Sequence, residues 1–262
     1  MEFALFFACM FGFGLIIGSF LNVVIMRSLR GEKLTGRSHC DSCGKTLSWF
    51  ELFPLFSFVY QKGRCLHCGT VFSVQYLVVE LGTALSFCAV LAYLFSYNLL
   101  LPDVRTFFLL LIVCVAASAM IVVLVADIRY QIIPNGAVLV LGIIGAGSVF
   151  LRSEHALTDI AASIGFCLFF AALWYFSDGK AMGFGDVKLI FATSLLVGFP
   201  ASLAAFLFSF WLGGLAGIIL ILTRRRGLKS RLAFGPFILV GTILAFFFSD
   251  SFFAFSGFSH FF

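Results

Sequence analysis

Four cysteines in the first third of the chain have the spacing of a metal site. They form two Cys-x-x-Cys pairs, Cys40 with Cys43 and Cys65 with Cys68, and a glycine directly follows each pair. Two residues between the thiols let one tight turn aim both sulfurs at a single ion, so two such pairs predict a tetrahedral zinc site. We expect the glycines to relieve crowding where the chain turns away. Four thiolates leave no open coordination position, which indicates a structural zinc.

The same cysteines can instead form two disulfides or a redox pair. Basic residues flank them on both sides, and the topology argued below places this segment in the cytosol, where disulfides are rare. Zinc is therefore the favoured interpretation. His39 and His67 stand next to cysteines in the sequence. We expect both histidines to lie beside the metal site or in solvent rather than to bind the ion.

Two aspartates stand at the edges of apolar segments, where acidic residues are otherwise rare. Asp127 closes one apolar run, seven residues before Pro134, and Asp186 ends a Gly-Phe-Gly-Asp motif. A carboxylate at membrane depth costs about 2.5–3.5 kcal/mol on insertion scales, so its retention indicates function. Two carboxylates held together share one proton, and such a pair can activate water while protonating a peptide carbonyl oxygen.

This chemistry would suit an aspartyl protease in which Asp127 and Asp186 are the catalytic pair. Gly183 and Gly185 would let the backbone and a substrate approach Asp186 closely, so they are the candidate substrate-binding residues. Pro134 would stop the helix that carries Asp127 from continuing.

Two other roles for these aspartates stay open on chemistry alone. Each carboxylate can pair with a nearby cation at the membrane interface, where Arg129 and Lys188 are available. A pair of membrane carboxylates also suits a proton-coupled transporter. A Gly-x-Gly-Asp pattern by itself does not decide between these roles and proteolysis.

The composition requires a lipid environment around the chain. Apolar residues make up 62% and charged residues 11% of its 262 residues, whereas soluble domains are about half apolar and a quarter charged. A chain this apolar cannot cover itself with polar surface in water. The first segment has no basic region and no small-residue cleavage site, so we expect a retained span rather than a signal peptide. The net charge of +5 follows from membrane topology, and no nucleic-acid partner is expected.

Eight apolar runs predict an all-α polytopic membrane protein with about eight transmembrane helices. The longer runs cover residues 3–26, 81–101, 107–126, 160–176, 201–222 and 232–248; residues 137–151 and 189–199 form shorter ones. With the N-terminus outside and all eight runs crossing, every Lys and Arg except Arg105 and Arg152 is cytosolic, as the positive-inside rule requires. The basic cluster at 224–231 falls on the cytosolic side only if residues 189–199 cross. The cysteines and both aspartates then share the cytosolic face.

The predicted organisation has three parts. A first transmembrane helix covers residues 1–26, a polar cytosolic insert with the zinc cysteines covers 27–75, and a membrane aspartyl protease domain covers 76–262. The insert carries the largest group of charged residues between two apolar runs, and no other segment looks like a soluble domain.

Taken together, the motifs resemble those of the bacterial type IV prepilin peptidase family. The resemblance covers nearly the whole chain in family order: Gly18-Ser19-Phe20-Leu21-Asn22 with Arg27, the two cysteine pairs, Asp127 with Pro134, Gly183-Phe184-Gly185-Asp186, and Phe234-Gly235-Pro236-Phe237. It implies an intramembrane aspartyl protease of the GxGD type in the bacterial cytoplasmic (inner) membrane. By this resemblance the catalytic aspartates are Asp127 and Asp186, and the zinc ligands are the four cysteines.

The resemblance also implies substrates and a second activity. Such enzymes cut the basic leader from type IV prepilins or type II secretion pseudopilins, and many then methylate the new N-terminus with S-adenosyl-L-methionine as methyl donor. Glu80 matches an acidic position at the start of the second span. Ser28 and Gln75 depart from the family pattern in the part linked to methyl transfer, and no residue here is assigned to the methyl donor. The alternatives are a proton-coupled transporter with a metal-binding insert and a membrane methyltransferase without protease activity.

Overall fold

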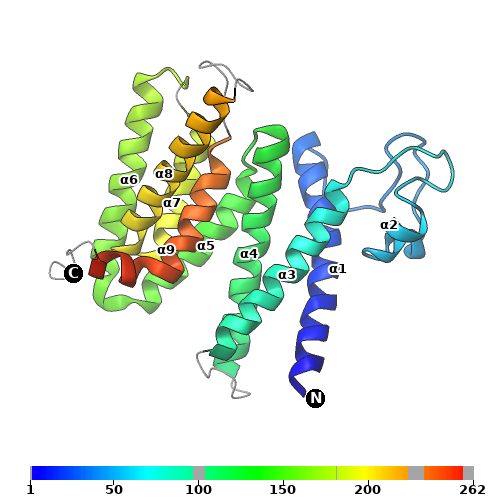
Figure 1. Cartoon of the computed structure of the whole chain (residues 1–262), viewed down its shortest axis with the longest axis horizontal. Coiled ribbons are helices and arrows are strands. Elements are labelled where there is room, and N and C mark those ends of the chain that lie inside the picture. The colour runs from blue at the N-terminus through cyan, green and yellow to red at the C-terminus, as the bar shows by residue number, and fades with distance from the viewer. Residues whose placement is uncertain (1, 97–103, 181, 224–232, 256–262) are drawn as a thin grey trace. The chain divides into compact units, whose positions relative to one another are not determined.

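The computed structural model describes residues 2–96, 104–180, 182–223 and 233–255 (Figure 1). Within these ranges it contains nine α-helices, two short 3-10 helices and no β-strand, so the all-α prediction is confirmed. The helices are α1 (Glu2–Arg30), α2 (Phe56–Tyr60), α3 (Gln75–Ser96), α4 (Val104–Tyr130), α5 (Asn135–Leu151), α6 (Ala156–Phe176), α7 (Phe184–Val197), α8 (Ala201–Leu222) and α9 (Gly235–Phe255), with η1 (Trp49–Leu52) and η2 (Ser153–His155).

Five of the described helices are long and apolar enough to cross a membrane, namely α1, α3, α4, α6 and α8. Helix α5 and the described apolar part of α9 are shorter, and α7 has only 14 residues. The chain is therefore a multi-pass membrane protein, and the full count of eight crossings stays a prediction. The basic cluster at 224–231 that supported this count lies outside the described residues.

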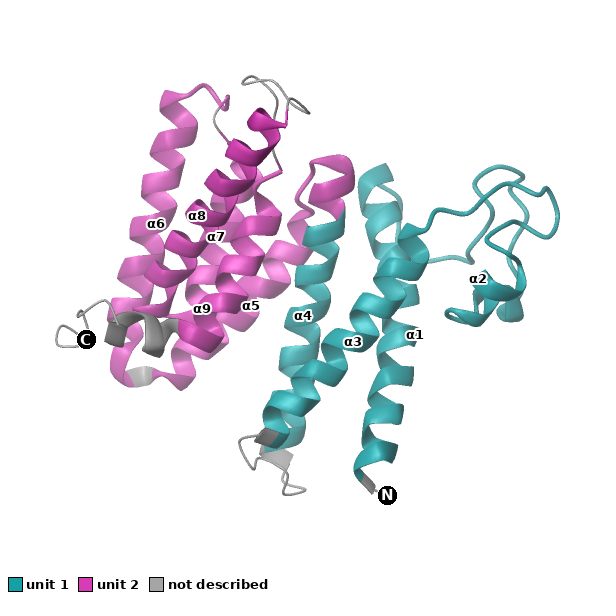
Figure 2. Ribbon diagram, in the orientation of Figure 1, with its two compact units in different colours: residues 1–125 teal, residues 126–262 magenta. Residues whose placement is uncertain are grey.

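The chain divides into two compact units, residues 1–125 and 126–262 (Figure 2). In the first unit, α1 packs along α3. Glycines make this contact close, because a Cβ atom on Gly14 would stand 2.5 Å from the Cα of Ala84, and one on Gly18 would stand 2.6 Å from the Cα of Glu80. The predicted insert connects these two helices and carries η1 and α2.

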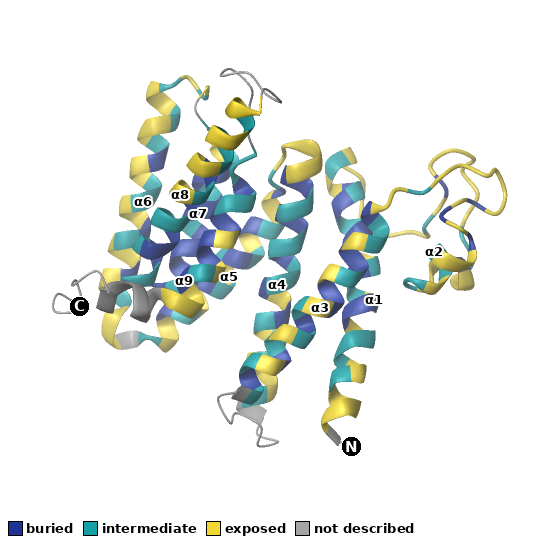
Figure 3. Cartoon of the chain, viewed as in Figure 1, coloured by how far each residue is buried: buried dark blue, intermediate teal, exposed yellow. Residues whose placement is uncertain are grey.

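In the second unit, α7 is the central helix and packs against α5, α6, α8 and α9. Eight of its residues are buried, including Asp186, Leu189 and Leu195, and Figure 3 shows this concentration of buried residues around α7. A helix that is buried on all sides is surrounded by protein rather than lipid. Its length therefore does not have to match the thickness of the bilayer, which accounts for its 14 residues.

Candidate active site and metal centre

Asp127 lies in the last turn of α4 and belongs to the second unit. Its carboxylate is buried and accepts a hydrogen bond from the backbone N–H of Gly235, at 2.9 Å from Oδ2. Gly235 is the first residue of α9, so its N–H has no partner inside its own helix. A Cβ atom at position 235 would stand 2.6 Å from Asp127 Oδ2. Only glycine therefore lets the start of α9 approach this carboxylate.

Asp186 lies in the first turn of α7, within the same unit. The backbone N–H of Gly183 donates to its Oδ2 at 3.1 Å, and the positive end of the helix dipole adds support for a carboxylate at this position. Its other oxygen, Oδ1, is buried without a hydrogen-bond partner. The two aspartates lie close enough for the charge of Asp127 to act on Asp186. Two carboxylates separated by some 59 residues are thus brought into one site.

Neighbouring cations do not neutralise these aspartates. None of the ion pairs among the described side chains includes Asp127 or Asp186. The Lys188 ammonium donates to Asn135 Oδ1 and stands 5.5 Å from the centre of the Phe184 ring. Lys188 therefore does not form the ion pair with Asp186 that the sequence left open.

The two glycines of the Gly-Phe-Gly-Asp motif have different local functions. Gly183 is the N-terminal cap of α7 and supplies an N–H group to Asp186. At Gly185 a Cβ atom would stand 3.0 Å from the Cβ of Ile133, so this glycine allows close packing against the segment between α4 and α5. Pro134 caps α5, whose first residue is Asn135, while α4 continues to Tyr130. Gly185 thus packs against another segment of the protein rather than facing an open space.

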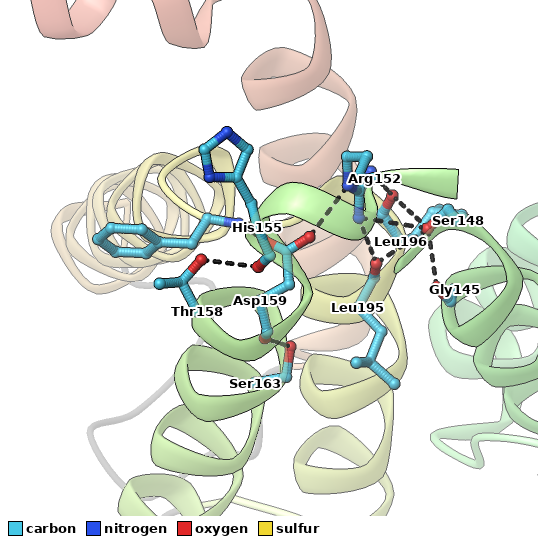
Figure 4. Close-up of polar contacts among 10 residues, drawn as sticks. Gly145, Ser148, Arg152, His155, Thr158, Asp159, Ser163, Leu195 and Leu196 are labelled. Atoms are coloured by element: carbon cyan, nitrogen blue, oxygen red, sulfur yellow. Dashed lines mark hydrogen bonds and ion pairs between the residues drawn. The ribbon is translucent and has the colours of Figure 1, made fainter. Parts of the chain in front are cut away.

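The opposite end of α7 is held by a polar cluster that sequence reasoning missed (Figure 4). Arg152, which follows α5, donates to the carbonyl oxygens of Leu195 at 2.9 Å and Leu196 at 3.1 Å. Its Nε also lies 3.0 Å from Oδ2 of Asp159 on α6. The other Asp159 oxygen accepts the N–H of Phe199 at 2.7 Å. We name this group the α7 clamp: Ser148, Arg152 and Asp159 together with the carbonyl groups they contact.

The α7 clamp satisfies carbonyl groups that the end of a helix leaves without partners. It also explains why Arg152 departs from the positive-inside pattern, since this residue serves packing rather than topology. A signal for it was present in the sequence. Arg152 and Asp159 are opposite charges seven residues apart between two apolar runs.

The four insert cysteines come together as the spacing predicted. Their sulfur atoms all lie within 4.8 Å of one another, and the Cys40 and Cys68 sulfurs are 3.8 Å apart. Tetrahedral zinc with Zn–S bonds of about 2.3 Å requires sulfurs about 3.8 Å apart, whereas a disulfide requires about 2.05 Å. The Thr70 hydroxyl, 3.3 Å from Cys68 Sγ, and the Thr70 backbone lower the pKa of this thiol to about 6. These residues fit a zinc ion.

Each cysteine pair sits on the same backbone turn. The N–H of Gly44 donates to the carbonyl of Cys40 at 2.9 Å, and the N–H of Gly69 donates to that of Cys65 at 2.9 Å. The expected reason for these glycines was wrong, because a Cβ atom at either position would meet no atom within 4 Å. Their φ angles of +70° and +71° are the actual reason, since residues with a side chain rarely adopt them.

Comparison with known proteins finds two family models along the chain. The Bacterial Peptidase A24 N-terminal domain matches residues 13–94, and the Type IV leader peptidase family matches residues 114–218. A "Prepilin leader peptidase/N-methyltransferase" of Bacillus subtilis is 34% identical over 94% of this chain and 96% of its own length.

Further relatives carry related names. A protein of the same name from Aeromonas salmonicida is 30% identical over 94% of this chain and 92% of its own length. A "Type 4 prepilin-like proteins leader peptide-processing enzyme" of Escherichia coli is 32% identical over 88% of this chain and 89% of its own length. No solved structure matches this chain.

Proposed function

This chain belongs to the family of prepilin leader peptidases/N-methyltransferases, and we propose that it cleaves the leader of type IV prepilins or type II secretion pseudopilins and then methylates the new N-terminus. The observation that carries the proteolytic half is the pair of buried carboxylates on α4 and α7, each held by one backbone N–H group. An exposed pair of acids would be hydrated and ionised. A buried pair in electrostatic contact holds one proton between them, which is the state that peptide hydrolysis needs.

In the proposed reaction, Asp127 and Asp186 act together on one water molecule and one peptide bond. Asp127, oriented by Gly235, takes a proton from the water as its oxygen attacks the carbonyl carbon. Asp186 gives its proton to the carbonyl oxygen, and Oδ1 is the atom available for this because it has no partner within the protein. When the tetrahedral intermediate collapses, a proton passes to the leaving amine and the pair regains its starting state.

Gly183 and Gly185 have supporting roles in the proposed site. Gly183 orients the carboxylate through its N–H group, and Gly185 keeps the start of α7 close to the segment that contains Ile133. Both therefore shape the place where a substrate peptide would lie against Asp186.

The methyl-transfer half of the proposal concerns the first unit. S-adenosyl-L-methionine would supply the methyl group, and the amine freed by proteolysis would accept it. The four cysteines would hold a zinc ion whose role is to fold the insert, because four thiolates leave it no open position. A small insert with little buried core depends on such a metal for its folded state.

The proposed setting is the bacterial cytoplasmic membrane, with the N-terminus outside and with the zinc insert and both aspartates on the cytosolic side. A basic leader would then stay in the cytosol while the apolar helix of the prepilin lies among the spans. A transporter is not favoured, because the relatives are named as leader-processing enzymes. A methyltransferase without protease activity is not favoured either, because both buried carboxylates are present.

The direct test is incubation of the purified protein with a prepilin, with and without S-adenosylmethionine, followed by mass analysis of the product. We expect a shortened pilin in both reactions and one added methyl group only in the second. Cleaved product without the methyl group, at saturating S-adenosylmethionine and with zinc bound, would reduce the function to proteolysis alone.

A further inference from the structure

The insert between α1 and α3 carries an exposed face of aromatic and aliphatic side chains. We name it the aromatic face; it consists of Trp49, Phe50, Phe53, Phe56, Val59 and Tyr60. Trp49, Val59 and Tyr60 have 78%, 71% and 76% of their surface exposed. Zinc binding does not explain these side chains, because the cysteines lie on other turns. A cluster of large apolar residues on a polar insert marks a surface that contacts something apolar.

One side of the aromatic face is fixed to the zinc-binding turns. Glu51 of η1 is buried; the N–H of Ser48 donates to its Oε2 at 2.8 Å, and His67 Nε2 lies 3.6 Å from its Oε1. The amide of Gln61 donates to the backbone carbonyl of Glu51 at 3.2 Å. These contacts turn the side chains of Glu51 and Gln61 inward. The aromatic residues are left on the outside.

A second attachment fixes the face to a membrane-spanning helix. The N–H of Leu55 donates to Glu80 Oε2 of α3 at 2.9 Å. Leu55 has a φ of +60°, and the N–H of Phe56 donates to the carbonyl of Pro54 at 2.7 Å. This tight turn is rare for a residue with a side chain. The hydrogen bond that Leu55 donates to Glu80 therefore holds a strained turn at a defined place on α3.

The position of the Leu55–Glu80 hydrogen bond on α3 determines how deep α2 lies relative to the membrane-spanning part of that helix. Glu80 lies five residues after Gln75, the first residue of α3, which is about 7.5 Å along the helix axis. Helix α3 is apolar enough to span from Gln75 onwards. The start of α2 is thus held about one and a half helical turns past the first residue of a spanning helix.

We propose that the aromatic face lies in the interfacial layer of the lipid bilayer and anchors the zinc insert to the membrane surface. Trp and Tyr are the residues that prefer this layer, and the Leu55–Glu80 hydrogen bond attaches the face to the spanning helix α3. The charges agree with lipid as the partner. Lys62 and Arg64 are exposed directly after α2, and the one acidic residue between positions 48 and 64, Glu51, is buried. Anionic headgroups attract such exposed cations.

Fluorescence of Trp49 tests this placement in the full-length protein. Trp174→Phe and Trp211→Phe leave Trp49 as the single tryptophan, and the protein is reconstituted into vesicles of phosphatidylcholine and phosphatidylglycerol. Replacing the acyl chains by brominated ones should clearly lower the Trp49 emission, because an interfacial tryptophan lies next to the acyl chains. Acrylamide added to the water should quench it far less than it quenches free tryptophan.

Variants separate lipid contact from misfolding. Phe56→Ser combined with Val59→Ser should abolish quenching by brominated lipid while leaving the metal content unchanged. Leu66→Ser, which alters an exposed apolar residue on a zinc-binding turn, should leave the quenching as it was. Strong quenching by acrylamide together with none by brominated lipid would overturn the proposal. The same would hold if only added prepilin shielded Trp49, since the face would then be a substrate surface.

Discussion

At the scale of single residues, backbone N–H groups rather than side chains position both carboxylates. Gly235 orients Asp127 and Gly183 orients Asp186. A backbone donor at the start of a helix cannot rotate away, so each carboxylate has one oxygen fixed and one available for chemistry. No ion pair among the described residues includes either aspartate, and such a pair would favour two charged carboxylates over the shared proton.

Gly235→Ala should strongly reduce leader cleavage. Its new Cβ atom would stand 2.6 Å from Asp127 Oδ2, and displacing a catalytic group by about 1 Å can lower a rate roughly 10²-fold. We expect kcat to fall with little change in KM, as measured on a purified prepilin. Gly214→Ala is the matched control, because a Cβ atom there would meet no atom within 4 Å. An active Gly235→Ala enzyme would show that this contact does not orient Asp127.

At the scale of elements, the α7 clamp holds the helix that carries Asp186. Arg152→Ala would leave the buried Asp159 carboxylate without its cation, and it would leave the Leu195 and Leu196 carbonyls with the Ser148 hydroxyl as their remaining side-chain donor. Breaking such a pair costs about 3 kcal/mol, so the unfolding temperature in detergent should fall clearly. Glu154→Ala, an exposed acidic residue of η2, is the control. Equal unfolding temperatures for the two variants would contradict the structural role of the clamp.

The insert is the second element whose state can be tested. We expect metal analysis of reduced protein, purified without chelators, to find one zinc ion per chain. Cys65→Ser combined with Cys68→Ser should remove the zinc and make the insert sensitive to protease, because zinc supplies the folding free energy of so small an insert. Cys167→Ser, outside the insert, should keep the metal. Unchanged zinc content in the double variant would exclude these ligands.

The sequence predicts elements better than the contacts between them. Hydropathy located every long helix, but it began the shortest run at residue 189, whereas α7 begins at Phe184 and includes Asp186 in its first turn. The apolar pattern could not show this, because the first five residues of α7 include a glycine, an aspartate and a lysine. The zinc ligands were predictable because two residues between thiols determine a turn. The bond from Gly235 to Asp127 joins positions 108 residues apart, and no local pattern encodes it.

At the scale of the whole molecule, the two proposed activities must occur in a fixed order. The amine that accepts the methyl group does not exist before the leader is cut. Asp127→Asn should therefore yield neither product from full-length prepilin, yet should still methylate a pilin that was cleaved beforehand. Mass analysis of both substrates checks this. Methylation of uncut prepilin, or its loss on the pre-cleaved pilin, would contradict the proposed division of labour.

The central claim is that Asp127 and Asp186 form one proteolytic pair, and cleavage by single Asn variants tests it most directly. Asparagine keeps an acceptor for the Gly235 or Gly183 N–H group but cannot hold the shared proton. The measurement is the rate of leader removal from purified prepilin by Asp127→Asn, Asp186→Asn and the unaltered protein, at matched unfolding temperature and zinc content. We predict no detectable cleavage by either variant. Near-normal cleavage by one of them would remove that aspartate from the catalytic pair.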